Sequence, residues 1–506
     1  MNAPKGLLSA ERRAAPTSAR APAVRGHAET GGVNIRTESL RIAGEKIAGD
    51  RHFEVRYPYT SEVVAVVPNA SVDDVRRAID IGAKFRSPLT RHDRYRILMK
   101  GGEIIANRRD EIARLITLES GLCLKDTLYE VGRASDVLLF SANQALVDDG
   151  QVFSCDVTPH GRKRKVYTMR EPLLGVITAI TPFNHPLNQV IHKVAPAIAT
   201  NNRVVLKPSE KTPLAAYLLA DILYEAGLPP PMLSVITGDP REIADELLTN
   251  AQVDLVTFTG GVAVGKRIAA KAVYKRQVLE LGGNDPIIVM EDADLDEAAT
   301  LAASGSYKNS GQRCTAVKRI LVQRKVADRF VELLLEKTKA LKFGDPLDPA
   351  NDMGTVIDEP AAKQFEQRVD VAVSQGAKLL TGNERIGALY SPTVVDHVRP
   401  EMTLVKQETF GPVSPVLRFD TIEDAIAISN STAYGLSSAV CTNRLDYITR
   451  FVSELQVGTV NVREVPGYRL ELTPFGGIKD SGLGYKEGVL EAMKSFTNTK
   501  TYSLPW

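Results

Sequence analysis

Leu255-Val256-Thr257-Phe258-Thr259-Gly260 is an apolar stretch that ends in glycine, and a helical pattern of apolar residues follows it from about Val262. A short apolar strand followed by a helix is the repeating unit of a parallel sheet. The unit recurs on both sides of this stretch. Further strand-like runs occupy residues 175–180, 203–207, 233–238 and 278–281, and helical patterns occupy residues 212–226 and the residues up to Leu248. The sequence therefore predicts an α/β fold with a mostly parallel, doubly wound sheet.

A second α/β unit is expected after Gly283. Its strand-like runs are residues 287–289 and 320–322, and its helical patterns are residues 295–304 and 327–341. Ligands of doubly wound sheets bind at the carboxyl ends of the strands. In the first sheet those ends carry Lys207, Gly238 and Gly260, which mark the expected ligand site.

The remaining residues form further segments. Residues 1–39 are rich in Ala, Arg, Pro, Thr and Gly without an apolar period, which predicts a disordered N-terminal extension. Apolar residues recur at helical spacing over residues 73–143, and Ser71 is typical of a helix start. Residues 151–169 alternate around a turn near His160, which predicts a hairpin, and residues 496–504 are strand-like.

The composition excludes several classes of protein. A chain of 506 residues exceeds what one core supports, and 43% hydrophobic with 25% charged residues is typical of a soluble globular protein. A net charge of +2 without a basic block argues against nucleic acid as a partner. No apolar run approaches the roughly 18 residues of a membrane span. The four scattered cysteines and seven histidines show neither CxxC nor HExxH, so we expect no metal and a reducing, cytoplasmic location.

One thiol and one carboxylate are candidates for chemistry. Cys314 stands in the run Ser310-Gly311-Gln312-Arg313-Cys314-Thr315, and Glu280 precedes it by 34 positions. A thiol can act as a nucleophile with a distant acid as its base. Because most single cysteines are buried and inert, the assignment depends on the surrounding motifs.

Six motifs occur in order along the chain. They are Phe183-Asn184-His185-Pro186, Lys207-Pro208-Ser209-Glu210, Phe258-Thr259-Gly260-Gly261, Leu279-Glu280-Leu281-Gly282-Gly283, Gly311-Gln312-Arg313-Cys314 and Glu408-Thr409-Phe410-Gly411-Pro412. In these motifs the chain resembles the NAD(P)-dependent aldehyde dehydrogenase superfamily from about residue 40 to 506. The resemblance implies a Rossmann-like NAD-binding domain (40–150 and 172–282), a catalytic domain (283–485) and oligomerisation strands (151–171 and 486–506) of a homodimer or homotetramer.

The resemblance also implies roles for individual residues. Cys314 is the expected nucleophile, Asn184 and the backbone N–H of Cys314 the oxyanion donors, and Glu280 the base that activates water. Since members that pass the acyl group to coenzyme A usually lack this acid, the expected product is a free carboxylate. The expected cofactor-binding residues are Lys207, Ser209, Glu210, Gly260, Gly261, Gly265, Glu408 and Phe410. Glu210 would repel a 2′-phosphate, so we expect NAD, with NADP used more weakly.

The substrate side is predicted to be polar and cationic. A helix is expected to follow Asn184 through residues 190–199, and His185, Gln189 and His192 would lie on one of its faces. Arg313 directly precedes the thiol, and Arg133 and Arg469 are expected at the same mouth. Guanidinium groups match phosphonate or phosphate and would lower the pKa of the Cys314 thiol. The combination of His185, Arg313 and the segment 465–469 resembles family members that act on phosphonoacetaldehyde, which implies its oxidation to phosphonoacetate as the expected reaction.

Other readings stay open at this point. The nearest is a member of the same family acting on succinate semialdehyde, sulfoacetaldehyde, lactaldehyde or glyceraldehyde 3-phosphate. A non-catalytic family member is a second alternative, although Cys314, Glu280 and Asn184 are all present. A redox-regulatory thiol protein is a third, and it would require a second cysteine close to Cys314 in space.

Overall fold

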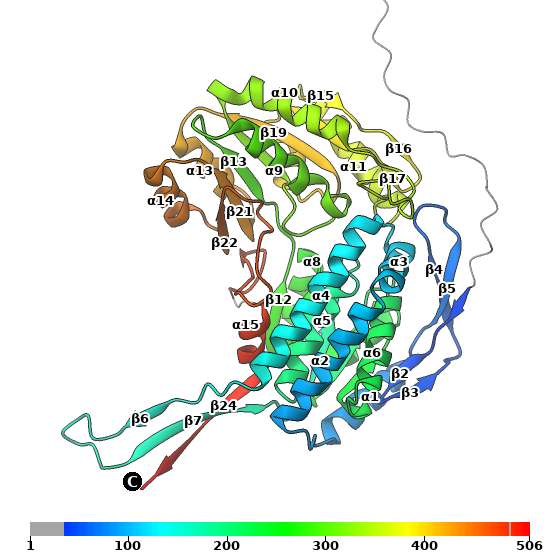
Figure 1. The fold of residues 1–506 in the computed structure, drawn as a ribbon, viewed down its shortest axis with the longest axis vertical. Coiled ribbons are helices and arrows are strands. Elements are labelled where there is room, and N and C mark those ends of the chain that lie inside the picture. The colour runs from blue at the N-terminus through cyan, green and yellow to red at the C-terminus, as the bar shows by residue number, and fades with distance from the viewer. Residues whose placement is uncertain (1–34, 485–486, 506) are drawn as a thin grey trace, which may run out of the picture. The chain divides into compact units, whose positions relative to one another are not determined.

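The computed structural model describes residues 35–484 and 487–505 (Figure 1). Residues 1–34 of the predicted extension therefore lie outside the described residues. The prediction of disorder is wrong for residues 36–39. Arg36–Thr37 forms strand β1, which pairs in parallel with β5 (Val63–Pro68). The backbone N–H of Glu38 continues the pairing by donating to the carbonyl of Val66.

The first sheet confirms the predicted strand and helix alternation. Its parallel strands are β8 (Val176–Ile180), β9 (Val204–Lys207), β10 (Leu233–Val235), β11 (Val253–Thr259) and β12 (Arg276–Glu280). The antiparallel strands β2 (Leu40–Ile42) and β3 (Glu45–Ile47) extend it, giving the order β12-β11-β8-β9-β10-β2-β3. The direction of winding reverses between β8 and β11. Ligand sites of doubly wound sheets lie at such a switch point.

Helices cover both faces of this sheet. Figure 1 shows α2 (Arg91–Asn107), α4 (Leu124–Ala145), α5 (Asn188–Ala199) and α6 (Leu214–Glu225) side by side, and with α3 (Arg109–Ser120) they bury one face. The other face is buried by α1 (Val72–Lys84), α7 (Pro240–Thr249) and α8 (Val262–Ala272). Alternate strand residues divide between the two cores, as Ile177 and Val176 do on β8. Ser71 caps α1 as predicted, since its hydroxyl accepts from the N–H of Asp74.

The second sheet has the order β15-β18-β19-β14-β13-β21-β22, with β15 as its antiparallel edge. Its strands are β13 (Pro286–Val289), β14 (Arg319–Gln323), β15 (Lys378–Thr381), β18 (Thr393–Asp396), β19 (Val413–Phe419), β21 (Ser437–Cys441) and β22 (Thr459–Val462). Its main helices are α9 (Leu295–Tyr307), α10 (Arg324–Ala340), α11 (Glu359–Ser374), α13 (Ile422–Asn430) and α14 (Leu445–Glu454). The predicted strands and helices β13, α9, β14 and α10 are confirmed.

Short elements complete the described fold. They are β4 (His52–Arg56), η1 (Pro230–Met232), η2 (Lys308–Gly311), β16 (Arg385–Ile386), β17 (Leu389–Tyr390), α12 (Thr403–Lys406), β20 (Tyr434–Gly435) and β23 (Ile478–Lys479). No helix among residues 35–484 and 487–505 combines the length and apolar character needed to cross a bilayer.

The predicted hairpin and the C-terminal strand form one three-stranded sheet. Strand β7 (Lys165–Pro172) pairs antiparallel with β6 (Val152–Ser154) and with β24 (Thr497–Leu504), and the three lie together at the lower left of Figure 1. The predicted strand segment 486–506 needs one correction. Val489–Ser495 is helix α15, and its apolar residues Val489 and Ala492 belong to the core beneath α5.

Candidate active site

Cys314 follows a turn whose backbone is unusual. Asn309, Ser310 and Gly311 take φ values of 56°, 52° and 70°. These values lie in the left-handed region, which is unfavourable for residues that have a Cβ. At Gly311 a Cβ would collide with the carbonyl oxygen of Gly411, so this position requires glycine. The turn thus presents the half-buried Cys314 from a fixed backbone.

Helix α4 holds this turn and the start of α5. A carboxylate oxygen of Asp126 accepts from the backbone N–H of Asn309 at 2.7 Å. One turn further on, Glu130 accepts from the N–H groups of Leu187 and Asn188 at 2.8 and 2.9 Å, and burial raises its pKa to about 7. The sequence prediction missed Asp126 and Glu130. Asp126, Glu130 and Arg133 stand at positions i, i+4 and i+7, so the sequence could have predicted that they share one face of the helix.

Asn184 and Cys314 lie on one cavity. The side-chain amide of Asn184 donates to the carbonyl of Gln312 at 2.8 Å, two residues before the thiol. The cavity measures about 410 Å³ and is lined by residues from both α/β units. The predicted site residues that line it are Asn184, Gln189, Gly260, Gly261, Cys314, Glu408 and Phe410. The structure therefore brings together the predicted nucleophile, the oxyanion donor and four of the eight predicted cofactor residues, whereas Lys207, Ser209, Glu210 and Gly265 lie outside the cavity lining.

Residues at the switch point fit a dinucleotide. Lys207 ends β9, and its ammonium lies 2.6 Å from a carboxylate oxygen of Glu210, while the Ser209 hydroxyl accepts from the N–H of Lys211. Helix α8 begins behind Gly261, and a Cβ on Gly261 would meet nothing within 4 Å, so its backbone is open to an approaching phosphate.

Gly265 is placed differently from the prediction. Its N–H donates within α8 to the carbonyl of Gly261 and so cannot face a pyrophosphate. A Cβ there would collide with the side chain of Leu281. Gly265 therefore allows α8 to pack closely against the residue that follows Glu280.

Glu408 is tied to the nucleophile through a buried lysine that the sequence prediction missed. The Lys318 ammonium lies 3.0 Å from a carboxylate oxygen of Glu408 and donates to the backbone carbonyl of Cys314 at 2.6 Å. Phe410 meets the Phe183 ring edge to face, with centroids 5.9 Å apart. Glu280 is buried at the end of β12, next to Leu281 on the cavity wall.

Two of the three predicted arginines share one buried carboxylate. Glu471 forms ion pairs with Arg133 and with Arg469, the latter at 3.4 Å, and lies 2.7 Å from Nε2 of His192. Of the predicted common face of His185, Gln189 and His192, only the last two residues lie within α5, which begins at Asn188, although the Gln189 N–H already donates to the carbonyl of His185. His185 therefore precedes the helix, Gln189 lines the cavity, and His192 turns to Glu471.

His185 and Arg313 each keep an unused polar atom. Nε2 of His185 accepts from the Asn309 amide at 2.9 Å, which leaves the proton on Nδ1. Burial, reinforced by Arg133, Arg313 and Arg469, holds the pKa of His185 well below its usual value, so the ring is neutral. Among the described residues, His185 Nδ1 and Arg313 Nε have no hydrogen-bond partner, although Arg313 also donates to the carbonyl of Gly305. Both groups can donate to a ligand.

The expected lowering of the thiol pKa is wrong for the free protein. Burial raises the pKa of Cys314 to about 11, and Lys318 and Arg469 offset only part of this effect. The sequence could not show this because desolvation depends on tertiary packing.

Alkylation of Cys314 should report this pKa. In the cofactor-free protein we expect the iodoacetamide rate at Cys314 to rise about tenfold per pH unit between about pH 7 and 10, because only the thiolate reacts. Mass spectrometry of the Cys314 peptide measures the rate, with Cys155 of the hairpin as internal comparison. A rate that levels off below about pH 9 would contradict the raised pKa.

Comparison with known proteins identifies the fold. Residues 46–502 match the model of the aldehyde dehydrogenase family. This chain belongs to the aldehyde dehydrogenase family. It is 38% identical over 468 residues to a 3-sulfolactaldehyde dehydrogenase of Priestia megaterium, covering 92% of this chain and 98% of that protein. It is 38% identical over 406 residues to a sulfoacetaldehyde dehydrogenase of Neptuniibacter caesariensis, covering 80% and 88%.

A solved structure agrees with this assignment. The glyceraldehyde-3-phosphate dehydrogenase GapN of Methanocaldococcus jannaschii, complexed with NADP, superposes with a TM-score of 0.86 at 37% identity, covering 90% of this chain and all of that one. The protein is thus an NAD(P)-dependent aldehyde dehydrogenase, an oxidoreductase. The open glycine backbone before α8 and the Lys207–Glu210 pair are where this aldehyde dehydrogenase would hold the cofactor.

Proposed function

We propose that this aldehyde dehydrogenase oxidises phosphonoacetaldehyde to phosphonoacetate, with NAD as its preferred cofactor. The observation that carries the proposal is the pair of unused buried donors, His185 Nδ1 and Arg313 Nε; Arg313 directly precedes the thiol in the chain. The charges of Arg133, Arg313 and Arg469 all act on His185. These groups form a site for an oxyanion attached to a short aldehyde.

The proposed chemistry uses three residues of the chain. The Cys314 thiolate adds to the aldehyde carbon, and the Asn184 amide with the Cys314 N–H stabilises the resulting oxyanion. A nicotinamide held between Glu408 and Phe410 would accept the hydride from the carbon bonded to Cys314, and a thioester would remain on Cys314. Glu280 then takes a proton from water, the hydroxide attacks the thioester carbon, and the C–S bond breaks to release the carboxylate and the thiolate.

The charges on the substrate side favour an anionic group. Arg133 and Arg469 pair with Glu471, the charge of Asp126 acts on Arg313, and burial lowers the pKa of both histidines. We propose that the three guanidinium groups prefer the two charges of a phosphonate to the single charge of a carboxylate or sulfonate. Sulfonated aldehydes are nevertheless the second candidate, because two of the related enzymes are named for sulfolactaldehyde and sulfoacetaldehyde.

Two further proposals concern the cofactor and the assembly. The Glu210 carboxylate stands beside Lys207 at the end of β9, where it would repel a 2′-phosphate and favour NAD. The sheet of β6, β7 and β24 leaves Val152 57% and Phe153 49% exposed, which supports a homodimer or homotetramer formed through these strands.

A substrate panel tests the proposed function. The purified enzyme is assayed with phosphonoacetaldehyde, sulfoacetaldehyde, succinate semialdehyde, lactaldehyde, glyceraldehyde 3-phosphate and propanal, each with NAD and NADP. We expect the highest kcat/KM with phosphonoacetaldehyde and NAD. The proposal is wrong if phosphonoacetaldehyde is oxidised no faster than propanal and Arg313→Ala leaves KM unchanged.

Asn184→Ala tests the oxyanion donor. Losing one preorganised donor is expected to lower kcat by roughly 10²–10³-fold, because the interaction strengthens only as negative charge develops on oxygen. KM should change little, which steady-state kinetics with the preferred aldehyde would show. Asn201→Ala, at a half-buried asparagine in the turn after α5, is the matched control and should keep kcat within about threefold.

A further inference from the structure

Glu471 is a buried acid at the centre of the substrate side. It is 4% exposed and lies in the segment between the loop that carries Arg469 and helix α15. Its carboxylate receives three side chains from three parts of the chain: Arg133 from α4, His192 from α5 and Arg469 from the loop. Its own backbone carbonyl accepts from the N–H of Val489 at the start of α15. The backbone that carries this carboxylate is therefore fixed independently of the ion pairs.

The loop before Glu471 is fixed beside the nucleophile. The Asn461 amide donates to the carbonyls of Val465, Pro466 and Tyr468 at 3.0, 3.0 and 3.1 Å. Gly467 lies so close to Thr315 that a Cβ would collide with the threonine side chain. Arg469 stacks over the Phe475 ring, 4.1 Å from its centroid. The backbone thus places Arg469 near the thiol, but the direction of its guanidinium depends on Glu471.

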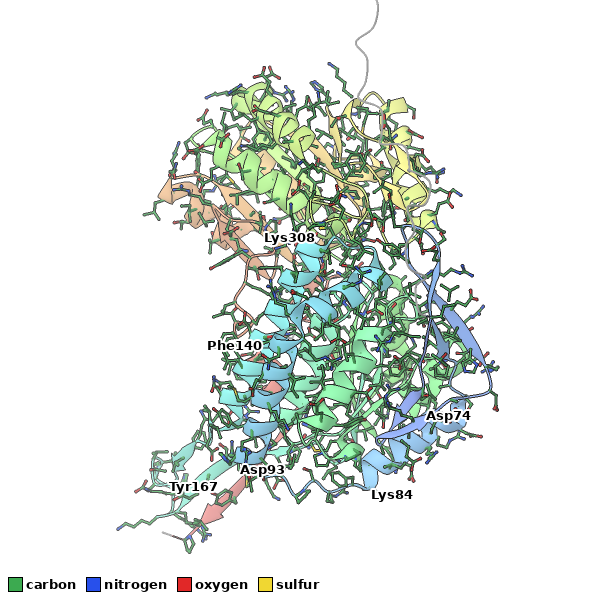
Figure 2. All side chains as sticks on the ribbon, turned by 45° about the vertical axis from the view of Figure 1, so that its right-hand side comes forward. Asp74, Lys84, Asp93, Phe140, Tyr167 and Lys308 are labelled. Atoms are coloured by element: carbon green, nitrogen blue, oxygen red, sulfur yellow. The ribbon has the colours of Figure 1, made fainter. Side chains whose placement is uncertain are left out.

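Arg133 depends on Glu471 in the same way. Its guanidinium carbon lies 5.9 Å from the Tyr129 ring centroid, and Lys308 lies over the same ring at 3.2 Å. Figure 2 labels Lys308 where the α4 region meets the second sheet. Another cation therefore stands close to Arg133, and without a carboxylate the like charges would separate.

We infer that Glu471 is the positioning residue that holds Arg133 and Arg469 ready for an anionic substrate. The inference rests on the proposed function. Because the carboxylate occupies one edge of each guanidinium, the remaining N–H groups are aimed before substrate arrives. Arg469, His192 and Arg133 keep the pKa of Glu471 low despite its burial, so the counter-charge persists across the neutral range.

Glu471→Gln tests this role through the charge of the aldehyde. For phosphonoacetaldehyde we expect kcat/KM to fall roughly tenfold or more, mainly through KM, since each misdirected charge-assisted hydrogen bond costs about that factor. For propanal, which has no anionic group, kcat/KM should stay within about threefold. Glu471→Asp keeps the charge and should recover part of the loss. If Glu471→Gln does not fold, Glu471→Asp is used for the test instead. Its kcat/KM should then fall by about threefold or more for phosphonoacetaldehyde alone.

Asp396→Asn is the matched control. Asp396 is also a buried carboxylate, and it pairs with Arg418 at 2.8 Å within the second sheet. This variant should leave the ratio of the two aldehydes unchanged. Equal losses for both aldehydes at Glu471, or an unchanged ratio, would overturn the inference while leaving the proposed function in place. A wild-type enzyme with no preference for the anionic aldehyde would overturn both.

Discussion

Cys314→Ala is expected to abolish aldehyde oxidation, with a fall in kcat on the order of 10⁴-fold or more. Alanine keeps the turn of Asn309, Ser310 and Gly311 but removes the atom that forms the covalent intermediate. The absorbance of the reduced cofactor measures the loss. Calorimetric titration with NAD should show unchanged cofactor affinity.

Cys155 provides the control for this substitution. It is the other cysteine of intermediate exposure, on the hairpin after β6, whereas Cys123 and Cys441 are buried. Cys155→Ala should keep kcat within about twofold. Retention of activity in Cys314→Ala would show that Cys314 is not the nucleophile and that the proposed thioester chemistry is wrong.

Glu280→Gln is expected to separate the two halves of the reaction. The first turnover should still release about one equivalent of reduced cofactor per active site, because thiol addition does not need the acid. Steady-state turnover should then fall by roughly 10²–10⁴-fold, since no base activates water for the thioester. Rapid-mixing absorbance would show the burst and the slow phase, and mass spectrometry would find the acyl group on Cys314.

Glu119→Gln is the comparison for this burst. Glu119 is fully buried and accepts from the N–H groups of Leu214 and Ala215 at the start of α6. Burial raises its pKa to about 8, so glutamine resembles its protonated state near neutral pH. This variant should turn over without a burst. If Glu280→Gln also shows no burst and its steady-state turnover equals that of the wild type, another group activates the water.

The first sheet was predictable because its strands are short apolar runs with residues at their ends that break strands. Each of β8, β9 and β11 is an apolar run that ends near a glycine or proline, and the following helix has its own period. The start of α5 was not predictable in this way. It depends on Glu130, which caps the N–H groups of Leu187 and Asn188 from a helix nearly 60 positions away, as the separations of 57 and 58 show.

The residues of the candidate site likewise fall into those predictable from local motifs and those that depend on tertiary contacts. Cys314, Asn184 and Glu408 stand in local motifs, so the sequence placed them correctly on one cavity. Glu471 and Lys318 carry no local signal, because their significance lies in partners brought close only by folding. The Arg133–Glu471 pair spans 338 positions. The pair of buried Lys318 and half-buried Glu408 joins the residue before β14 to the segment before β19. Desolvation of Cys314 escaped the prediction for the same reason.

The last strand constrains how the polypeptide is made. Thr497 pairs with Pro172, and Leu504 pairs with Lys165. Strand β7 therefore cannot complete its pairing until residues more than 300 positions later have been synthesised. Helix α15 likewise supplies Val489 to a core built mostly from earlier helices. A nascent chain therefore cannot complete this sheet until residues 497–504 have left the ribosome. Truncation at residue 496 should leave β7 an exposed edge and favour aggregation during synthesis.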